Sequence, residues 1–317
     1  MKKKGSKREE GGIKKVSKLK SDLKKQKWLH IFVLMGVIWM IIFSYIPMGG
    51  IVISFKNYRV IDTIWSAPWV GLENFRDIFM DDMFLPIMKN TIGISVIGLV
   101  IGFPLPIIFA LMLNELTNVK MKKFSQTISY LPHFLSWVVL GGMMINWLGE
   151  TGIFNDIMQN FGIAETGKVW LADKTKFWGI AISSGLWKEL GWNSIIYLAA
   201  IAGIDPGLYE AARIDGAGKL QQIWHITLPS IKGIVVLFLV LSVSNVLNVN
   251  WEQMLVLQNP LTLETSEVLD TYVYKMGLIN GRFSFATAIG LFKSLVAFVL
   301  LITANKVTKK LNDTSIL

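Results

Sequence analysis

The sequence predicts an all-α membrane protein that crosses the bilayer six times. Of its 317 residues 52% are hydrophobic, the mean hydropathy is +0.48, and the apolar residues gather in long runs. This is more apolar than an ordinary soluble domain. A helical span takes about 20 residues, whereas a strand of a membrane barrel takes about ten of alternating character. Runs of the observed length therefore favour helices.

Six runs reach this length, and we interpret each as one span. They cover residues 28–53, 92–113, 127–148, 177–204, 233–251 and 283–304. The second, third and fifth contain no Asp, Glu, Lys or Arg. The first follows a basic segment, as the apolar core of a signal peptide does, but it is too long for such a core and no A-x-A cleavage pattern follows it. We expect it to remain as a helix.

Lys and Arg are distributed unevenly between the loops. Twelve of the 32 precede Trp28, in a basic tail formed by residues 1–27. This tail, the C-terminal end at 306–317 and the two loops on the same side hold 21, while the three loops on the other side hold nine. The basic side of a membrane protein is the cytoplasmic side. We therefore expect a multi-pass membrane protein with both termini in the cytoplasm.

The charge and cysteine content exclude several classes of function. The net charge of +10 comes largely from the basic tail beside a span, which is typical of contact with anionic lipid, so we expect no nucleic acid partner. The chain contains no cysteine. A disulfide framework, a cysteine-ligated zinc site and a thiol nucleophile are therefore impossible.

The loop at residues 205–230 carries the most specific local pattern. Asp205 followed by Pro206 is a helix start, with a capping carboxylate and a proline at the first helical position. Gly216 and Gly218 end this helix and turn the chain. A second short amphipathic piece runs to Pro229, which we expect to break the helix before the fifth span. The pattern predicts a helix–turn–helix elbow on the cytoplasmic face.

The first helix of this elbow has a shallow apolar face. Leu208, Ala211 and Ala212 lie on it, while Glu210 and Asp215 lie on the other faces. By itself this pattern leaves two interpretations open. The elbow either rests on lipid as an amphipathic element or offers a docking surface to another protein.

The same loop resembles the signature of ABC-importer permeases. Glu210-Ala211-Ala212, then Gly216, then Ile226-x-Leu228-Pro229 fit the pattern EAA-x3-G-x9-I-x-L-P at every fixed position. Further similarity extends through "LPHFLSWVV" (131–139), residues 191–230, "NPLTLETSEVLDTYVYKMG" (259–277) and "FSFATAIGLFKSLVAFVLL" (283–301). Together these segments resemble the LplB-like branch of the binding-protein-dependent sugar transport family, which takes up oligo- and polysaccharides.

The resemblance implies a type I ABC-importer transmembrane domain in a bacterial plasma (inner) membrane, with a permease core at residues 88–305 after the first span. The loop then acts as a coupling helix seated in a groove of a cytoplasmic ATPase. The residues implied in coupling are Leu208, Glu210, Ala211, Ala212, Asp215, Gly216, Ile226, Leu228 and Pro229.

The resemblance also implies a set of partners. They are a second, different permease, two copies of a cytoplasmic ABC ATPase, and an extracytoplasmic binding protein, expected to be a lipoprotein, that docks on the loops at 54–91 and 252–282. This chain would then be a transport subunit and no enzyme. ATP and magnesium would bind the partner ATPase, and the chain itself would hold no cofactor and no metal.

Polar and aromatic residues within or beside the spans are candidates for the substrate path, because amides pair with sugar hydroxyls and an indole stacks on a sugar ring. The candidates are Trp187, Lys188, Trp192, Asn193, Asn245, Asn248 and Trp251. Each also has a structural interpretation. The tryptophans suit interfacial anchors. Asn245 and Asn248, three apart on one helical face, suit hydrogen bonds between helices.

Charged residues inside spans are costly and call for partners. Lys188 and Glu189 suit an interhelical ion pair or a wet cavity, and Lys293 in the sixth span is interpreted in the same way. Consecutive helical residues point about 100° apart, so we expect Lys188 and Glu189 to contact different neighbours. The candidate path has no charge excess, which favours a neutral oligosaccharide as cargo.

Three rival functions remain as alternatives. An importer permease for a non-sugar solute would share the loop signature. An ion-coupled secondary transporter would need midplane carboxylates, and the spans offer only Glu189. A membrane enzyme would need an acidic pair or a metal cluster at membrane depth.

"GIAETGKV" (162–169) resembles a phosphate-binding loop but has Val169 where a hydroxyl residue is required.

Overall fold

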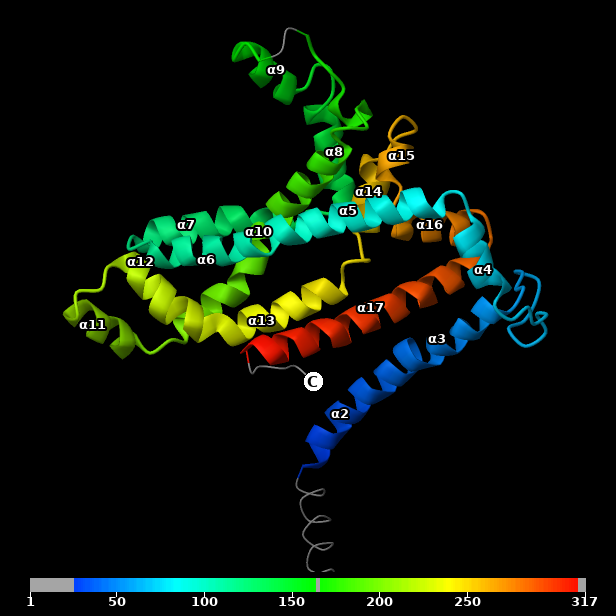
Figure 1. Cartoon of the computed structure of the whole chain (residues 1–317), viewed down its shortest axis with the longest axis horizontal. Coiled ribbons are helices and arrows are strands. Elements are labelled where there is room, and N and C mark those ends of the chain that lie inside the picture. Colours follow the sequence, from blue (N-terminus) through cyan, green and yellow to red (C-terminus); the bar gives the residue numbers. More distant parts are fainter. Residues whose placement is uncertain (1–25, 164–165, 313–317) are drawn as a thin grey trace, which may run out of the picture.

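The computed structural model describes residues 26–163 and 166–312, and this part of the chain is built from helices (Figure 1). One isolated antiparallel bridge joins Lys56 to Trp69. Of the basic tail predicted at residues 1–27, all but Gln26 and Lys27 lies outside these ranges, and the C-terminal end is described as far as Asn312. Four helices are long and apolar enough to cross a membrane, or six if each of two bent helix pairs counts as one span.

The first span is a continuous helical run that stands apart from the other helices. It comprises α2 (Lys27–Met40), a π-helical turn η1 (Ile41–Tyr45), α3 (Ile46–Met48) and a 3-10 segment η2 (Gly49–Phe55). Every residue of α2, η1 and α3 is exposed. In Figure 1 the run extends away from the body, and only its η2 end packs against the helix that forms the sixth span.

The second span is longer than predicted. After the short α4 (Glu73–Met80), α5 (Phe84–Gly102) continues into α6 (Pro104–Glu115), so that the span runs from Phe84 to Glu115. The polar residues Lys89 and Asn90 lie just before the predicted start of this span at residue 92. Asn90 is buried within α5, where neighbouring main-chain oxygens accept its hydrogen bonds, so the helix continues through it.

The third span, predicted as one helix over 127–148, is instead broken. α7 (Val119–Tyr130) continues into η3 (Leu131–Phe134) and meets α8 (Trp137–Trp147) at an angle of 101°. Leu135 and Ser136 are extended, and the Ser136 hydroxyl accepts the N–H of Val139 at 3.3 Å. A serine that caps a new helix ends the old one, so the single-helix prediction is wrong here.

The fourth span matches its prediction closely. α9 (Ile153–Asn160) and the 3-10 turn η4 (Trp170–Ala172) precede α10 (Phe177–Ala202), which covers the predicted 177–204 almost completely. After a bend of 69° the chain enters α11 (Pro206–Ile214).

The fifth span begins earlier and ends earlier than predicted. α12 (Lys219–Gln222), the π-helical η5 (Ile223–Thr227) and α13 (Leu228–Ser244) form one helical run of 26 residues. Pro229 therefore does not break the helix. It lies in the first turn of α13, directly after the wide π-helical turn, so that the ladder is already interrupted where the proline has no N–H to donate.

Residues 245–250 are not helical, although the prediction placed them in the fifth span. They lead to three short helices, α14 (Trp251–Leu257), α15 (Leu263–Ser266) and α16 (Leu269–Tyr274), and to the π-helical η6 (Lys275–Ile279). The sixth span, α17 (Phe283–Asn312), includes the predicted 283–304.

The buried apolar residues form three separate clusters that hold the spans together. One lies between α8, α10 and α14, a second between α4, α5, α16 and α17, and a third between α6, α10 and α13. α10 contributes to the first and third. It is therefore the central helix of the packing, and the elbow that follows it is attached directly to this centre.

Candidate functional site

The elbow, defined here as residues 205–229, begins as predicted. The Asp205 carboxylate accepts the N–H of Gly207 at 2.9 Å, and Pro206 occupies the first helical position of α11. Capping satisfies an N–H that has no partner within the helix. The start of α11 is therefore well defined directly after α10.

The turn at Gly216 also forms as predicted and can be described in detail. Gly216 has φ +80°, its N–H donates to the Arg213 oxygen at 3.1 Å, and the Ala217 N–H donates to the Ala212 oxygen at 2.8 Å. These two bonds define a Schellman motif, which requires the left-handed conformation that glycine adopts without strain. Gly218 has an ordinary φ of −71° and starts α12.

Side-chain contacts tie the two arms of the elbow together. The Tyr209 hydroxyl, on α11, lies 2.9 Å from the Thr227 hydroxyl on η5, and Thr227 is buried. The Gln222 amide donates to the Ala217 oxygen at 2.9 Å. Lys219 pairs with Glu115, at the end of α6, at 2.5 Å. The Tyr209–Thr227 contact thus joins α11 to the helical run that becomes α13, while the Lys219–Glu115 pair joins that run to α6.

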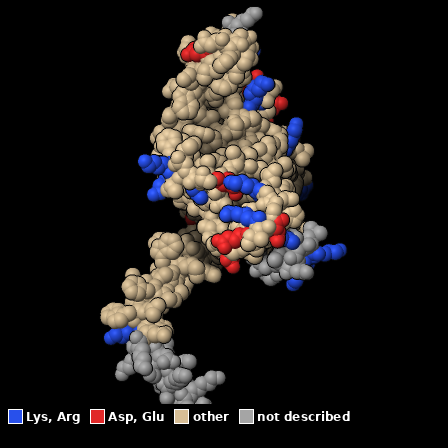
Figure 2. Space-filling view, turned by 90° about the vertical axis from the view of Figure 1, so that its left-hand side faces the viewer, with Lys and Arg blue, Asp and Glu red and all other residues tan. Residues whose placement is uncertain are grey.

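The elbow presents apolar side chains to its surroundings. Leu208 and Leu220 are exposed, and Ile214 and Trp224 are 87% and 66% exposed. Of the predicted coupling residues, Glu210, Ala211, Asp215, Gly216 and Pro229 are exposed, while Ala212, Ile226 and Leu228 are half-buried. Figure 2 views this end of the molecule, where α7, α11 and α12 lie, and shows Lys, Arg, Asp and Glu gathered there. The first span, which extends below in this view, carries almost no charged side chains.

A second polar cluster lies where α10 passes the break in the third span. Lys188, midway along α10 and buried, donates to the His133 oxygen at 2.6 Å and lies 3.6 Å from the Glu189 carboxylate. The other Glu189 oxygen lies 2.8 Å from Nδ1 of His133, within hydrogen-bond distance. The expectation of different neighbours is therefore wrong. Both residues contact His133: the long Lys188 side chain reaches its main-chain oxygen, and Glu189 contacts its ring.

Two of the substrate-path candidates line one pocket. The Trp192 ring stacks on His133 with centroids 4.2 Å apart, and Trp192, Asn193 and Glu189 line a pocket of about 440 Å³ between α5, α6, α10 and α13. Trp187 is absent from this lining and borders a different pocket. The buried Lys188 faces the break at Pro132 and His133.

The remaining candidates lie around the interruption of the fifth span. The Asn248 amide donates to the Asn245 oxygen at 2.8 Å, and both side chains are exposed. They are neighbours as predicted, although through a turn and not along a helix. Trp251 begins α14 and stacks on Tyr274 with centroids 5.2 Å apart.

Asp270 contacts the residues at this interruption of the fifth span and also the sixth span. One of its oxygens accepts the Val249 N–H at 3.0 Å, and the other pairs with the Lys293 ammonium of α17. Lys293 thus has the ion-pair partner that a charge within a span requires. The partner comes from α16, outside the six predicted spans.

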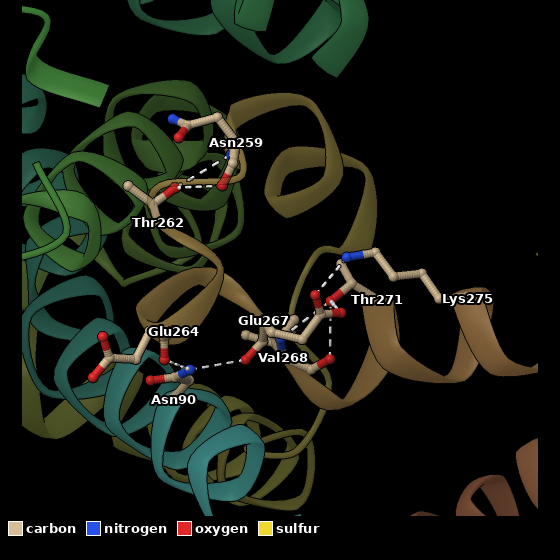
Figure 3. Close-up of polar contacts among 8 residues, drawn as sticks. All are labelled: Asn90, Asn259, Thr262, Glu264, Glu267, Val268, Thr271 and Lys275. Carbon is tan, nitrogen blue, oxygen red and sulfur yellow. Dashed lines mark hydrogen bonds and ion pairs between the residues drawn. The ribbon is translucent and has the colours of Figure 1, made fainter. Parts of the chain in front are cut away.

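The outward-predicted segment 252–282 is folded and tied to the second span (Figure 3). The Asn90 amide donates to the main-chain oxygens of Glu264 and Glu267 at 2.9 and 3.0 Å. The buried Glu267 carboxylate accepts from the Thr271 hydroxyl at 2.8 Å and pairs with Lys275. Burial raises the pKa of the Tyr272 phenol, which therefore stays protonated and donates to Asp81.

Several of these residues were missed by sequence reasoning. His133, Asp270 and the Tyr209–Thr227 contact are not among the residues that the sequence singled out as site candidates. His133 and Asp270 lie in two of the segments that carry the family resemblance, which was the available signal. Among the described residues no group of three His, Asp or Glu side chains is placed to hold a metal ion. Ala164 and Glu165 of "GIAETGKV" lie outside the described residues.

Comparisons with known proteins agree with this architecture. The chain is 41% identical, over 92% of its length and 91% of the relative's, to the polygalacturonan/rhamnogalacturonan transport system permease protein YteP of Bacillus subtilis. It is 38% identical, over 92% and 91%, to protein LplB of the same organism.

Solved structures and a family profile point the same way. A chain of a bacterial ABC transporter involved in the import of the acidic polysaccharide alginate matches with a TM-score of 0.84 and 38% identity. The match covers 93% of this chain and 99% of that one. A second structure holds an alginate transporter in complex with an alginate pentasaccharide-bound periplasmic protein and matches equally well.

The profile described as binding-protein-dependent transport system inner membrane component matches residues 102–313, which include the elbow. The chain therefore belongs to this family of inner membrane components and is a multi-pass permease subunit of a binding-protein-dependent importer.

Proposed function

We propose that this permease imports an oligo- or polysaccharide, driven by ATP hydrolysis on a separate ATPase that binds the elbow. The observation that carries the proposal is the elbow itself. It is braced by the Tyr209–Thr227 contact, exposes apolar side chains, and is continuous with α10 on one side and α13 on the other.

The elbow suits helix-in-groove recognition by an ATPase. The exposed Leu208 and Ala211 offer a shallow apolar surface, and Glu210 and Asp215 are available to basic residues at the rim of a groove. Because the elbow is braced, a displacement of α11 moves α10 and α13 together. Both helices line the pocket that contains Trp192. Closure of the ATPases would therefore be transmitted to the interior of the permease.

The assembly we propose contains a second, different permease, two ATPase copies and an extracytoplasmic binding protein seated on the outer loops. The folded segment 252–282 provides a rigid surface for that protein. The orientation we propose places both termini and the elbow in the cytoplasm, in keeping with the excess of Lys and Arg on that side.

The names of the relatives favour acidic glycans as cargo, because polygalacturonan and alginate are both acidic polysaccharides. The lack of a charge excess along the candidate path favours neutral ones. Acidic and neutral glycans both have ring faces, on which Trp192 can stack, and hydroxyls, with which the amides of Asn245 and Asn248 can pair. We propose a glycan cargo on this shared chemistry and leave its charge to the experiment.

The test is uptake by proteoliposomes that contain the whole importer with its binding protein. We expect ATP-dependent uptake of one glycan class from a panel of galacturonan, alginate and neutral arabinan oligosaccharides. Glu210→Lys should abolish uptake and ATPase co-purification, whereas the same charge change at the exposed Asp156 of α9 should preserve both. Uptake driven by an ion gradient without ATP, or normal uptake by Glu210→Lys, would contradict the proposal.

A further inference from the structure

We propose that the groove between α8, α9 and α10 is a binding site for one acyl chain of a phospholipid whose phosphate is held by Lys176. The groove has a volume of about 540 Å³, which lies within the range of small-molecule sites, about 300–1,000 Å³. It is separate from the pocket that contains Trp192. The inference does not depend on the identity of the cargo.

The two pockets lie on opposite sides of α10. Ile180, Ser183 and Trp187 border the groove, whereas Gly185, Glu189 and Trp192 border the other pocket. Trp187 and Glu189 are two residues apart, which turns their side chains about 200° from each other on a helix. A molecule in the groove therefore occupies the side of α10 that faces away from the pocket that contains Trp192.

The length of the groove suits a lipid tail. On α10 it extends from Lys176, directly before the helix, to Trp187, which corresponds to about 16 Å of helix. One leaflet of the hydrocarbon core is about 15 Å deep. A groove of this length, followed along α10 as a membrane span, would extend from the level of the headgroups to the centre of the bilayer.

The walls of the groove suit a hydrocarbon occupant. They are mainly apolar side chains from the three helices, including Met144, Trp147, Ile153 and Ile157. The two hydroxyls present, Ser183 and Ser184, both donate to the Ile180 oxygen of their own helix, at 3.2 and 2.7 Å. Both hydroxyl donors are therefore already paired within α10. This suits a hydrocarbon chain, which has no acceptor to offer them.

The outer end of the groove has the features of a membrane interface. Lys176 is exposed there, and its ammonium complements a phosphate. Trp147 and Trp170 line the same end, in keeping with the enrichment of tryptophan at headgroup level. α9 adds Ile153 and Ile157, and Phe161 follows directly after the helix. The three are spaced four residues apart and are all exposed, which gives this segment one apolar face.

This outer wall is held in place by a buried amide. The Asn155 side chain donates to the oxygens of Gly149 and Lys168 at 2.6 and 2.7 Å and accepts the indole N–H of Trp170 at 2.8 Å. The Trp170 ring also meets Phe154 edge-to-face, with centroids 5.1 Å apart. The groove is therefore preformed, which lowers the cost of binding a flexible chain.

The experiment uses the complete importer in nanodiscs with phosphatidylglycerol that carries a photoactivatable diazirine in one acyl chain. After irradiation, peptide mapping should find adducts concentrated in residues 144–157 and 176–187. Gly179→Leu places a side chain in the groove, and its Cβ meets nothing within 4 Å. It should lower these adducts several-fold.

Two further variants distinguish a site from general lipid contact. Gly142→Leu, on α8, adds the same side chain at an equally open position that does not line the groove, and should leave the adducts unchanged. Lys176→Gln should lower phosphatidylglycerol capture about fivefold, as expected for one lysine near a lipid phosphate.

The proposal fails if adducts are spread evenly over the apolar helices, the exposed α2 included, and Gly179→Leu does not change them. It also fails if a photoreactive amino acid at Ser183 captures the second permease or the binding protein in place of lipid. In that case the groove is a protein interface. Absence of adducts from both peptides in the unmodified importer would refute it as well.

Discussion

Replacing Gly216 with alanine tests whether the bend of the elbow matters for coupling. The left-handed conformation at φ +80° costs a residue with a Cβ roughly 1–2 kcal/mol. A Cβ at this position meets nothing within 4 Å, so the cost arises from the backbone alone. If the ATPase binds only the bent elbow, its affinity falls by about 5- to 30-fold at most.

The matched control lies two residues further on. Gly218 has φ −71°, and a Cβ there has its nearest contact at 3.8 Å, so Gly218→Ala should leave ATPase affinity unchanged. Gly216→Asn should fall between the two, because asparagine tolerates the left-handed conformation better than alanine.

The assay is titration of the purified ATPase against the permease pair in nanodiscs, with transport measured in parallel. Membrane insertion of all variants should be normal, because the turn lies outside the buried clusters. Equal affinity for Gly216→Ala and Gly218→Ala would refute the idea that the Schellman turn positions the coupling helix.

Three other substitutions test the internal contacts. Tyr209→Phe removes one side-chain hydrogen bond from the elbow, worth about 1 kcal/mol. It should slow ATP-driven transport, while the melting temperature of the permease pair changes little. Asp270→Asn leaves the Lys293 ammonium without its ion partner and should cost about 3–5 kcal/mol, seen as a lower melting temperature that Lys293→Met partly restores. Gly191→Ala places a Cβ 2.1 Å from a main-chain oxygen of α7, so assembled protein should be lost, whereas Gly142→Ala should be recovered normally.

Much of this arrangement could be predicted because it depends on local chemistry. The start of α11 at Asp205 and its end at Gly216 follow from capping and from backbone conformation, which a few residues determine. The fourth and sixth spans follow from apolar runs bounded by polar residues. In each case the deciding interaction lies within one or two turns of helix.

The errors arose where distant residues decide the conformation. Hydropathy averaged over a window could not reveal that Ser136 starts a new helix, or that Asp270 receives the Val249 N–H beyond the end of α13. The contact of Lys188 with the main chain of His133 depends on how two spans pack. Periodicity gives the direction of a side chain but not its reach.

The 26-residue helical run from Lys219 to Ser244 fixes an angle as well as a distance of about 39 Å. One added residue would advance the Asn245 turn by only about 1.5 Å, yet it would rotate that turn about 100° relative to the elbow. The number of residues between the two is therefore under as much constraint as their identity. An insertion here would aim the asparagine amides at a different neighbour while every side chain stayed the same.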